Sequence, residues 1–314
     1  MTITISAAQS RTAGKGYAIA LVGVLIWSTT AIFIRYLTAY QQIPPILLAA
    51  WRDLLASLTM MIALGIFNRR LLHLPKPHWG FIAGYGVILS LFNALWTLSV
   101  AFNGAAISVV LVYSSAAFTA ILARFLFRES LSLAKGLAIA ASLSGCALVA
   151  GALQPEMWRL NPLGMLTGLL SGVAMSGYSL FGKESARRGM SAWTALAYTF
   201  GIAAVILFFG SWLLPSYLGG IPAGNSFIPS LENNGWAALI LLAIGPTIGG
   251  YGLYTLSMSY LPASVVNLIA TLEPTFTAAQ AYFLLGERFT LEQVAGSLLI
   301  LGGVVALRIG EKGQ

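Results

Sequence analysis

The chain is expected to be an all-α integral membrane protein with ten transmembrane helices arranged as two inverted five-helix repeats. The first observation is its composition, because the 314-residue chain is 58% hydrophobic and 8% charged, whereas soluble domains carry about 25% charged residues. The second is an internal repeat at a constant offset. The third is that each copy holds an odd number of apolar stretches long enough to cross a bilayer.

The repeat is clearest between residues 95–145 and 253–303, which align without a gap at an offset of 158 residues. The identical pairs include Leu95/Leu253, Thr97/Thr255, Leu98/Leu256, Ser99/Ser257, Phe118/Phe276, Glu129/Glu287 and Gly145/Gly303. So long a run at one offset is improbable by chance, even in a Leu- and Ala-rich chain. A duplication is therefore predicted, with copies 1–153 and 154–314.

The first copy is predicted to hold five spans of about 20 mostly apolar residues each, the length needed to cross the hydrocarbon core. These spans are Gly16–Leu37, Pro44–Phe67, Trp79–Phe102, Ala105–Phe127 and Lys135–Leu153. Asn103-Gly104 divides the third span from the fourth, because the uncharged run on either side is too long for one helix.

The second copy is predicted to hold five more spans. They are Pro162–Lys183, Ala192–Leu214, Gly235–Met258, Ala263–Leu285 and Leu291–Leu307. Leu261-Pro262 divides the eighth span from the ninth, and a long loop rich in Pro, Gly, Ser and Asn, residues 215–234, separates the seventh from the eighth.

Lysine and arginine in short loops indicate orientation, because they concentrate on the cytoplasmic side. With the N-terminus in the cytoplasm, thirteen basic residues fall inside and three, Arg35, Arg159 and Arg288, fall outside. Both termini are therefore predicted to be cytoplasmic. Because five is odd, tandem copies must have opposite orientations, an architecture typical of secondary transporters whose substrate site lies near the midplane.

Several classes of protein and site are disfavoured. The net charge of +8 does not indicate nucleic acid, because no basic run interleaves with aromatics. The single cysteine, Cys146, excludes an internal disulfide. No ligand set surrounds His73 or His78, so no metal and no cofactor is predicted. The run Gly177–Lys183 satisfies G-x-x-x-x-G-K but precedes Glu184, so it is not a phosphate-binding loop.

A family resemblance rests on three features. They are Trp27-Ser28 in the first span, Leu272-Glu273-Pro274 followed by Leu284-Leu285-Gly286-Glu287 across the ninth, and a weaker echo that closes on Glu129. These residues resemble the EamA-type branch of the drug/metabolite transporter superfamily over residues 16 to 308. The resemblance implies a basket-like exporter of small metabolites that has a central cavity. It also implies that the protein lies in the inner membrane. Within the family, the chain looks most like bacterial exporters of amino acids, including aromatic ones.

Glu273 is the sharpest candidate for function. An ionisable group inside an apolar span normally faces a cavity or a partner, because leaving it in lipid is costly. Pro274 frees a backbone carbonyl one turn earlier and favours a kink. Glu273 is predicted to bind a substrate ammonium or to take up a proton, and the alternative is a structural hydrogen bond. Ser115-Ala116 stands at the equivalent place in the fourth span, so the role is not duplicated.

Arg52 and Asp53 form a second candidate. Adjacent residues on a helix point about 100° apart, so the two are expected to pair poorly with each other. Arg52 lies about 12 Å below the outer end of its span. One interpretation is that Arg52 meets a substrate carboxylate while Asp53 holds another helix. The other is that Arg52 extends toward the outer headgroups.

Aromatic and amide side chains within the spans are predicted to line the cavity, although interhelical packing is the alternative for each. The further candidates for this wall are Trp27, Ser28, Asn93, Trp96, Tyr113, Tyr178, Tyr251, Tyr254 and Asn267. The predicted gating or hinge residues are Gly245, Pro246, Gly249, Pro274 and Lys183. Glycines and a proline indicate a bent eighth helix. Lys183 is alternatively an ordinary positive-inside anchor.

The leading hypothesis is a secondary transporter that exports amino acids or similar small metabolites by alternating access, with Glu273 as one route for proton coupling. An exporter of cationic compounds or a nucleotide-sugar-type carrier of the same fold is an alternative. A passive channel and an intramembrane enzyme are remote alternatives. No catalytic residue is predicted, because Asp53 is the only aspartate and no histidine lies in a span.

Overall fold

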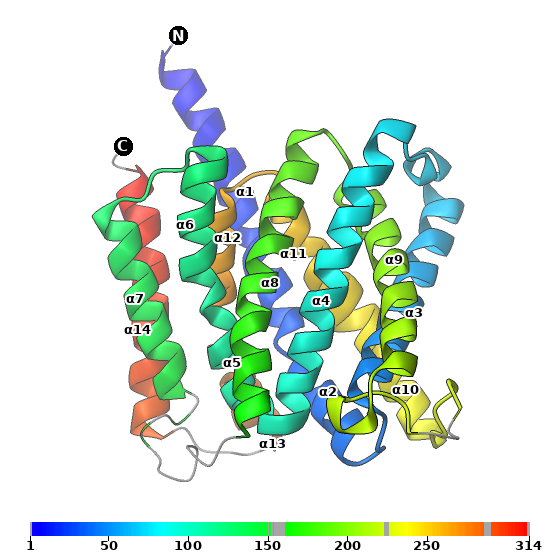
Figure 1. Ribbon diagram of the computed structural model, residues 1–314. Coiled ribbons are helices and arrows are strands. Elements are labelled where there is room, and N and C mark those ends of the chain that lie inside the picture. Colours follow the sequence, from blue (N-terminus) through cyan, green and yellow to red (C-terminus); the bar gives the residue numbers. More distant parts are fainter. Residues whose placement is uncertain are drawn as a thin grey trace.

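The computed structural model of the protein is a bundle of helices (Figure 1). It describes residues 2–149, 151, 153, 161–222, 226–285 and 290–312. Within these ranges all regular structure is helical, which confirms the all-α prediction. Seven helical segments there are long and apolar enough to cross a membrane, and two shorter apolar helices, Leu133–Val149 and Leu291–Ala306, fall on the predicted fifth and tenth spans. Arg159, Gly286, Glu287 and Arg288 lie outside the described residues.

The described residues up to Val149 form seven α-helices. They are α1 (Thr2–Trp27), α2 (Thr30–Ala39), α3 (Pro45–Phe67), α4 (Trp79–Asn103), α5 (Ala105–Tyr113), α6 (Ser115–Phe127) and α7 (Leu133–Val149). Short 3₁₀ turns over Arg69–Leu72 and Lys76–His78 connect α3 to α4. Pro45 occupies the first turn of α3, where its missing N–H costs no hydrogen bond.

The second copy begins with two uninterrupted helices and then becomes irregular. Its elements are α8 (Pro162–Arg187), α9 (Ala192–Leu213), α10 (Asn233–Leu242), the π-helix η5 (Ala243–Tyr251), α11 (Gly252–Ser257), α12 (Ala263–Ala270), α13 (Glu273–Leu285) and α14 (Leu291–Lys312). A 3₁₀ turn, Ser216–Leu218, lies between α9 and α10. Asn161 caps α8, because its side chain accepts a hydrogen bond from the Leu163 N–H at 2.9 Å.

The predicted bend of the eighth span is the π-helix η5. Pro246 lies inside it and has no N–H to bond the carbonyl of Leu242. The hydroxyl of Thr247 donates to that carbonyl instead, at 2.7 Å. The span therefore continues, but its hydrogen bonding changes from α to π and back.

Three further spans are interrupted where a hydroxyl bonds the carbonyl three residues earlier. Ser28, Ser114 and Thr271 make these bonds at 2.7, 2.7 and 2.6 Å, in competition with the helix. Ser114 is the repeat equivalent of Leu272, so the fourth and ninth spans break at the same place. Pro274 follows the break in the ninth span only, so the proline is not its sole cause.

Paired helices organise the bundle. Helices α7 and α14 lie side by side at one flank, and α3 and α9 lie together at the opposite flank (Figure 1). Between the flanks, α4 packs on α8, and α1 packs on η5 and α11. Glycines let α8 approach its neighbours closely, because a Cβ at Gly164 or Gly168 would lie 2.5 Å from the Asn103 or Leu111 side chain.

Both chain ends lie at the same end of the bundle (Figure 1). The basic connection 68–78, between α3 and α4, lies at that end too, as does the connection between α8 and α9. The link between α2 and α3 and the loop between α9 and α10 lie at the other end (Figure 1).

Candidate functional site

A small internal cavity lies at the centre of the bundle. Its volume is about 10 Å³, room for about one water molecule. It is lined by Trp27, Phe92, Trp96, Val112, Tyr113, Met175 and Glu273. These residues come from both copies, through α1, α4, α5, α8 and α13. All of them are buried, so little room is left between these helices.

Four predicted site residues meet in this cavity: Trp27, Trp96, Tyr113 and Glu273. The other three lining residues, Phe92, Val112 and Met175, were not predicted. They are ordinary apolar residues of apolar spans, and only their position relative to other helices distinguishes them.

Glu273 is the one ionisable acid on the cavity wall. It is 3% exposed and begins α13, where the partial positive charge of a helix N-terminus favours a carboxylate. The Tyr113 hydroxyl donates to its Oε2 atom. Its Oε1 atom is buried and has no hydrogen-bond partner among the described residues. One carboxylate oxygen is therefore engaged by the protein and the other is free to accept. Pro274, beside it, is buried in the first turn of α13.

Aromatic rings surround the cavity behind Trp27. The Trp27 ring centroid lies 4.7 Å from that of Tyr251 and 5.0 Å from that of Tyr254. Tyr178 lies 5.5 Å from Tyr251, centroid to centroid. Gly250 lets η5 approach this closely, because a Cβ there would lie 2.9 Å from the Cβ of Trp27. Such a wall suits an aromatic or apolar side chain.

Arg52 and Asp53 form a buried pair, which corrects the prediction that they would pair poorly. The Nε atom of Arg52 lies 3.2 Å from Oδ1 of Asp53, because the long arginine side chain can bend back toward its neighbour. Asn93 donates to the other oxygen of Asp53 at 2.7 Å, and the Tyr251 hydroxyl donates to Asn93 at 3.0 Å. Arg52 is 0% exposed, so it does not extend to the headgroups.

Three other predicted cavity residues are occupied by interhelical hydrogen bonds. Asn267 donates to Thr119 and to Ser179, both at 3.0 Å. Tyr254 shares a hydrogen bond of 2.8 Å with Ser179. Tyr178 shares one of 2.7 Å with Thr255. Their polar tips hold helices together in this conformation, and the rings of the two tyrosines pack 6.1 Å apart, centroid to centroid.

Ser28 is directed toward α13. Its hydroxyl donates to its own helix and accepts a hydrogen bond from Gln280 at 2.8 Å. The Thr277 hydroxyl donates to the backbone carbonyl of Ser28 at 3.0 Å. The break between α1 and α2 is thus fastened to the helix that begins with Glu273. Sequence reasoning missed Gln280, since no motif marks it.

Lys183 binds the backbone where α11 ends. Its Nζ atom donates to the carbonyls of Met258 and Leu261, at 3.0 and 2.8 Å. The side chain is half-buried, and its amine is bound to the backbone of another segment. Of the other predicted gating residues, Gly249 packs against Ile26, and a Cβ at Gly245 would meet nothing within 4 Å.

Glu129 and Lys135 bind the same connection from the other side. The backbone N–H of Ala263 donates to Glu129 at 3.1 Å, and the Ser264 hydroxyl donates to the other oxygen. Lys135 donates to Ser264 at 3.0 Å and lies 3.9 Å from Glu129. Glu129 therefore binds the first residues of α12, and we call residues 258–264, which these charged side chains bind, the charged turn.

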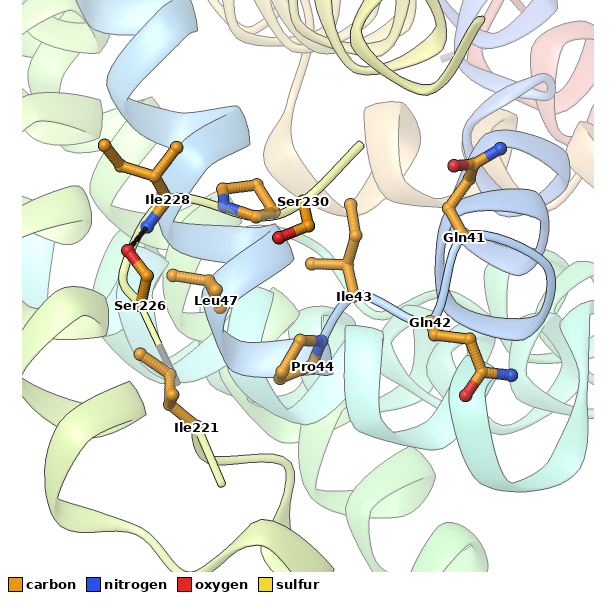
Figure 2. Close-up of a pocket in the computed structure, with 10 residues that line it drawn as sticks. Gln41, Gln42, Ile43, Pro44, Leu47, Ile221, Ser226, Ile228 and Ser230 are labelled. Carbon is orange, nitrogen blue, oxygen red and sulfur yellow. Dashed lines mark hydrogen bonds between the residues drawn. The ribbon is translucent and has the colours of Figure 1, made fainter. Parts of the chain in front are cut away.

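A larger pocket of about 380 Å³ opens at the opposite end of the bundle. Figure 2 shows its lining: Gln41, Gln42, Ile43, Pro44, Leu47, Ile221, Ser226, Ile228, Pro229 and Ser230. The loop on one side is held in place because Trp51 donates to the carbonyl of Phe227 at 2.8 Å. The pocket joins two segments that lie far apart in the sequence, and no local pattern predicted it.

Comparison with known proteins shows that two segments of the chain match the same family. Residues 14–151 and 162–309 each match the EamA-like transporter family. A probable amino-acid metabolite efflux pump of Salmonella typhimurium is 25% identical over 290 residues, which cover 91% of this chain and 92% of that protein. A protein of the same name from Escherichia coli is 25% identical over 295 residues, covering 92% and 93%.

Other matches differ in extent. An uncharacterized transporter of Archaeoglobus fulgidus is 28% identical over 142 residues, which are 45% of this chain and 46% of that protein. A solved crystal structure superposes with a TM-score of 0.73 over 94% of this chain and 97% of that one, at 19% identity. This likeness shows the fold.

Proposed function

Because the chain belongs to the EamA-like transporter family, we propose that it exports small metabolites, chiefly amino acids with aromatic or other hydrophobic side chains, by alternating access. Family membership makes it a multi-pass membrane transporter rather than an enzyme. Two relatives named as probable amino-acid metabolite efflux pumps support the substrate class.

The observation that carries the proposal is the central cavity. It combines aromatic rings with one carboxylate, Glu273, whose Oε1 atom is buried and free. A substrate ammonium or a proton is the chemistry that such an oxygen accepts. In the present conformation the cavity is too small for an amino acid, so the proposal requires it to widen when one end opens.

The inverted ten-helix repeat is part of the proposal. When a two-fold axis relates two equivalent residues, they can contact each other only if both lie close to that axis. Asn93 and Tyr251 are 158 residues apart and share a hydrogen bond of 3.0 Å. Their contact supports an axis through the centre of the bundle, between copies 1–153 and 154–314.

Helices α7 and α14 give independent support. A Cβ at Gly145 would lie 2.5 Å from the carbonyl oxygen of Gly296, and one at Gly303 would lie 2.9 Å from that of Ala138. Gly145 is equivalent to Gly303, and Ala138 to Gly296, at the offset of 158. The contact is therefore reciprocal, as a two-fold axis requires.

The end that carries both termini is proposed to face the cytoplasm in the plasma (inner) membrane. The basic connection 68–78 lies at that end, as the positive-inside rule requires.

Replacement of Glu273 tests the function. In loaded cells, Glu273→Gln is expected to lower amino-acid efflux about tenfold and to flatten its pH profile, because glutamine keeps the shape but cannot ionise. The matched control is Glu292→Gln, at an exposed glutamate in the first turn of α14. Unchanged efflux and an unchanged pH profile at equal expression would remove Glu273 from the mechanism.

A second candidate is an exporter of cationic compounds, and the free Glu273 oxygen favours it. Growth protection against an amino-acid analogue and against a lipophilic cation separates the two. Saturable counterflow in liposomes argues against a passive channel.

A further inference from the structure

The hydrogen bonding of Arg52 is incomplete. The side chain is fully buried and its Nε atom is paired with Asp53 at 3.2 Å. Its Nη1 and Nη2 atoms are also buried and have no hydrogen-bond partner in the described part of the chain. A guanidinium carries four N–H groups on those two atoms. Since leaving charged donors unpaired away from water is costly, an acceptor is expected there.

Asp53 is already engaged on both oxygens. One oxygen binds Arg52, and the other accepts from Asn93 at 2.7 Å. Asn93 is itself held by the Tyr251 hydroxyl at 3.0 Å. This chain of bonds fixes the guanidinium through its Nε side and leaves the Nη side available. Two parallel N–H groups in one plane match a carboxylate in a bidentate arrangement.

Glu273 has an unpaired hydrogen-bond acceptor, whereas Arg52 has unpaired donors. Its Oε1 atom is a buried acceptor without a donor. In the described ranges, the remaining buried side-chain atoms without partners belong to hydroxyls, an amide and a histidine. Arg52 and Glu273 are thus the two residues of opposite formal charge that are left incomplete. An acceptor is needed at one and a donor at the other.

We propose that Arg52 and Glu273 form a two-point site for a zwitterionic α-amino acid. Arg52 binds the α-carboxylate and Glu273 binds the α-ammonium. The inference rests on the proposed transport function and extends its recognition chemistry from Glu273, which lines the central cavity, to Arg52.

Tyr251 contacts neighbours of both residues in the present conformation. Its hydroxyl bonds Asn93 on the Arg52 side. Its ring lies 4.7 Å from Trp27, which lines the cavity with Glu273. Tyr251 ends the π-helix η5, and π-helical segments are frequent at functional sites. Displacement of this residue would let one ligand reach both Arg52 and Glu273.

Charge balance explains why a zwitterion fits better than its analogues. An amine without a carboxylate would satisfy Glu273 and leave the Nη atoms of Arg52 unpaired. A carboxylic acid without an amine would satisfy Arg52 and leave Glu273 unpaired. A zwitterion satisfies both and adds no net charge to a buried site.

The test uses three ligands that share a phenyl ring and differ in their charged groups: phenylalanine, 2-phenylethylamine and 3-phenylpropionate. Their binding to the purified full-length protein is measured by calorimetry, with leucine, isopentylamine and 4-methylpentanoate as an aliphatic set. The wild-type protein is expected to prefer each amino acid about tenfold or more over both analogues, since a buried unpaired charge costs at least that factor.

The variants give a reciprocal pattern. Arg52→Gln is expected to weaken amino-acid binding about tenfold and to leave amine binding within about twofold. Glu273→Gln is expected to weaken amino-acid binding similarly and to leave acid binding unchanged. Arg52→Lys keeps the charge without the bidentate geometry and serves as the folding control, with monodispersity checked by size exclusion.

Two outcomes would overturn the two-point site. One is an equal loss of all three ligands in Arg52→Gln, which indicates a structural role. The other is that the wild-type protein binds the amine more tightly than the amino acid. That result would indicate an exporter of cationic compounds in which Arg52 binds no substrate carboxylate. Failure of the proposed function itself is distinguishable, because the wild-type protein would then neither bind nor export any amino acid.

Discussion

Two links at opposite ends of the bundle are equivalent in the repeat and differ in chemistry. Leu261-Pro262 joins α11 to α12, and Asn103-Gly104 joins α4 to α5, at an offset of 158 residues. At the first link, Lys183 binds two carbonyls, while Glu129 and Lys135 bind the start of α12. Charged side chains from three segments therefore converge on the charged turn.

The other link is closed by neutral groups. Asn103 accepts from the backbone N–H of Asn161 at 2.8 Å and donates to its carbonyl at 3.3 Å. Ser99 donates to Ser108 at 2.8 Å, and Gly104 makes the turn with φ of +78°, which favours glycine. Arg35, which matches Lys183 at an offset of 148, is exposed.

The comparison shows that two links at equivalent places in the repeat are held by different interactions. One is bound by charged side chains and the other by neutral groups. Hydrogen bonds to charged groups are stronger than neutral ones, and more so where water is excluded. We therefore expect the end with the charged turn to be the more firmly closed of the two.

Removal of Glu129 is expected to have the largest effect. Glu129→Ala takes the acceptor from the Ala263 N–H and the Ser264 hydroxyl and leaves Lys135, 5% exposed, without its carboxylate. The free energy of unfolding should fall by about 3 kcal/mol, measured by unfolding in mixed micelles. Glu292→Ala is the exposed control. A loss below about 0.5 kcal/mol would abolish the distinction between the two ends.

Replacement of Lys183 sharpens the comparison through accessibility. Two matched reporters, Met258→Cys and Val100→Cys, occupy equivalent positions that are both 0% exposed, in a chain whose buried Cys146 is replaced by alanine. Lys183→Met should raise thiol labelling at the Met258 position about tenfold, since it opens that end alone. Labelling at the Val100 position should not change. Equal increases at both would mean global loosening.

The neutral link should be the least sensitive. Asn103→Ala is expected to cost about 1 kcal/mol of unfolding free energy, the value of ordinary hydrogen bonds, in the same micelle assay. Arg35→Gln should change it by less than about 0.5 kcal/mol, because the side chain is exposed. A cost for Asn103 equal to that for Glu129 would show that the two closures are equivalent.

Local pattern was sufficient for the helical class, for the position of several apolar spans and for part of the site. Apolar length located α3 within one residue, and Gly245-Pro246 located the irregular span. Glu273 stood out because a carboxylate is rare in such a sequence. The break at Ser114 had no proline to mark it, and it depends on a hydroxyl that bonds its own helix.

What escaped prediction was contact between helices distant in sequence. Phe92, Val112 and Met175 look like any apolar residue until α4, α5 and α8 meet. The bent-back pairing of Arg52 with Asp53 is a choice among rotamers that helical periodicity does not determine. The convergence of Lys183 and Glu129 on one turn requires knowledge of which helix ends are neighbours.

The pocket of Figure 2 has a consequence for the direction of transport. None of its described lining residues is charged, although it could hold a solute many times larger than the central cavity admits. In the proposed topology it faces away from the cytoplasm. A departing amino acid would exchange ionic contacts for amides, hydroxyls and water, so its residence there would be brief. Weak retention at the exit would then keep release from limiting the rate of export.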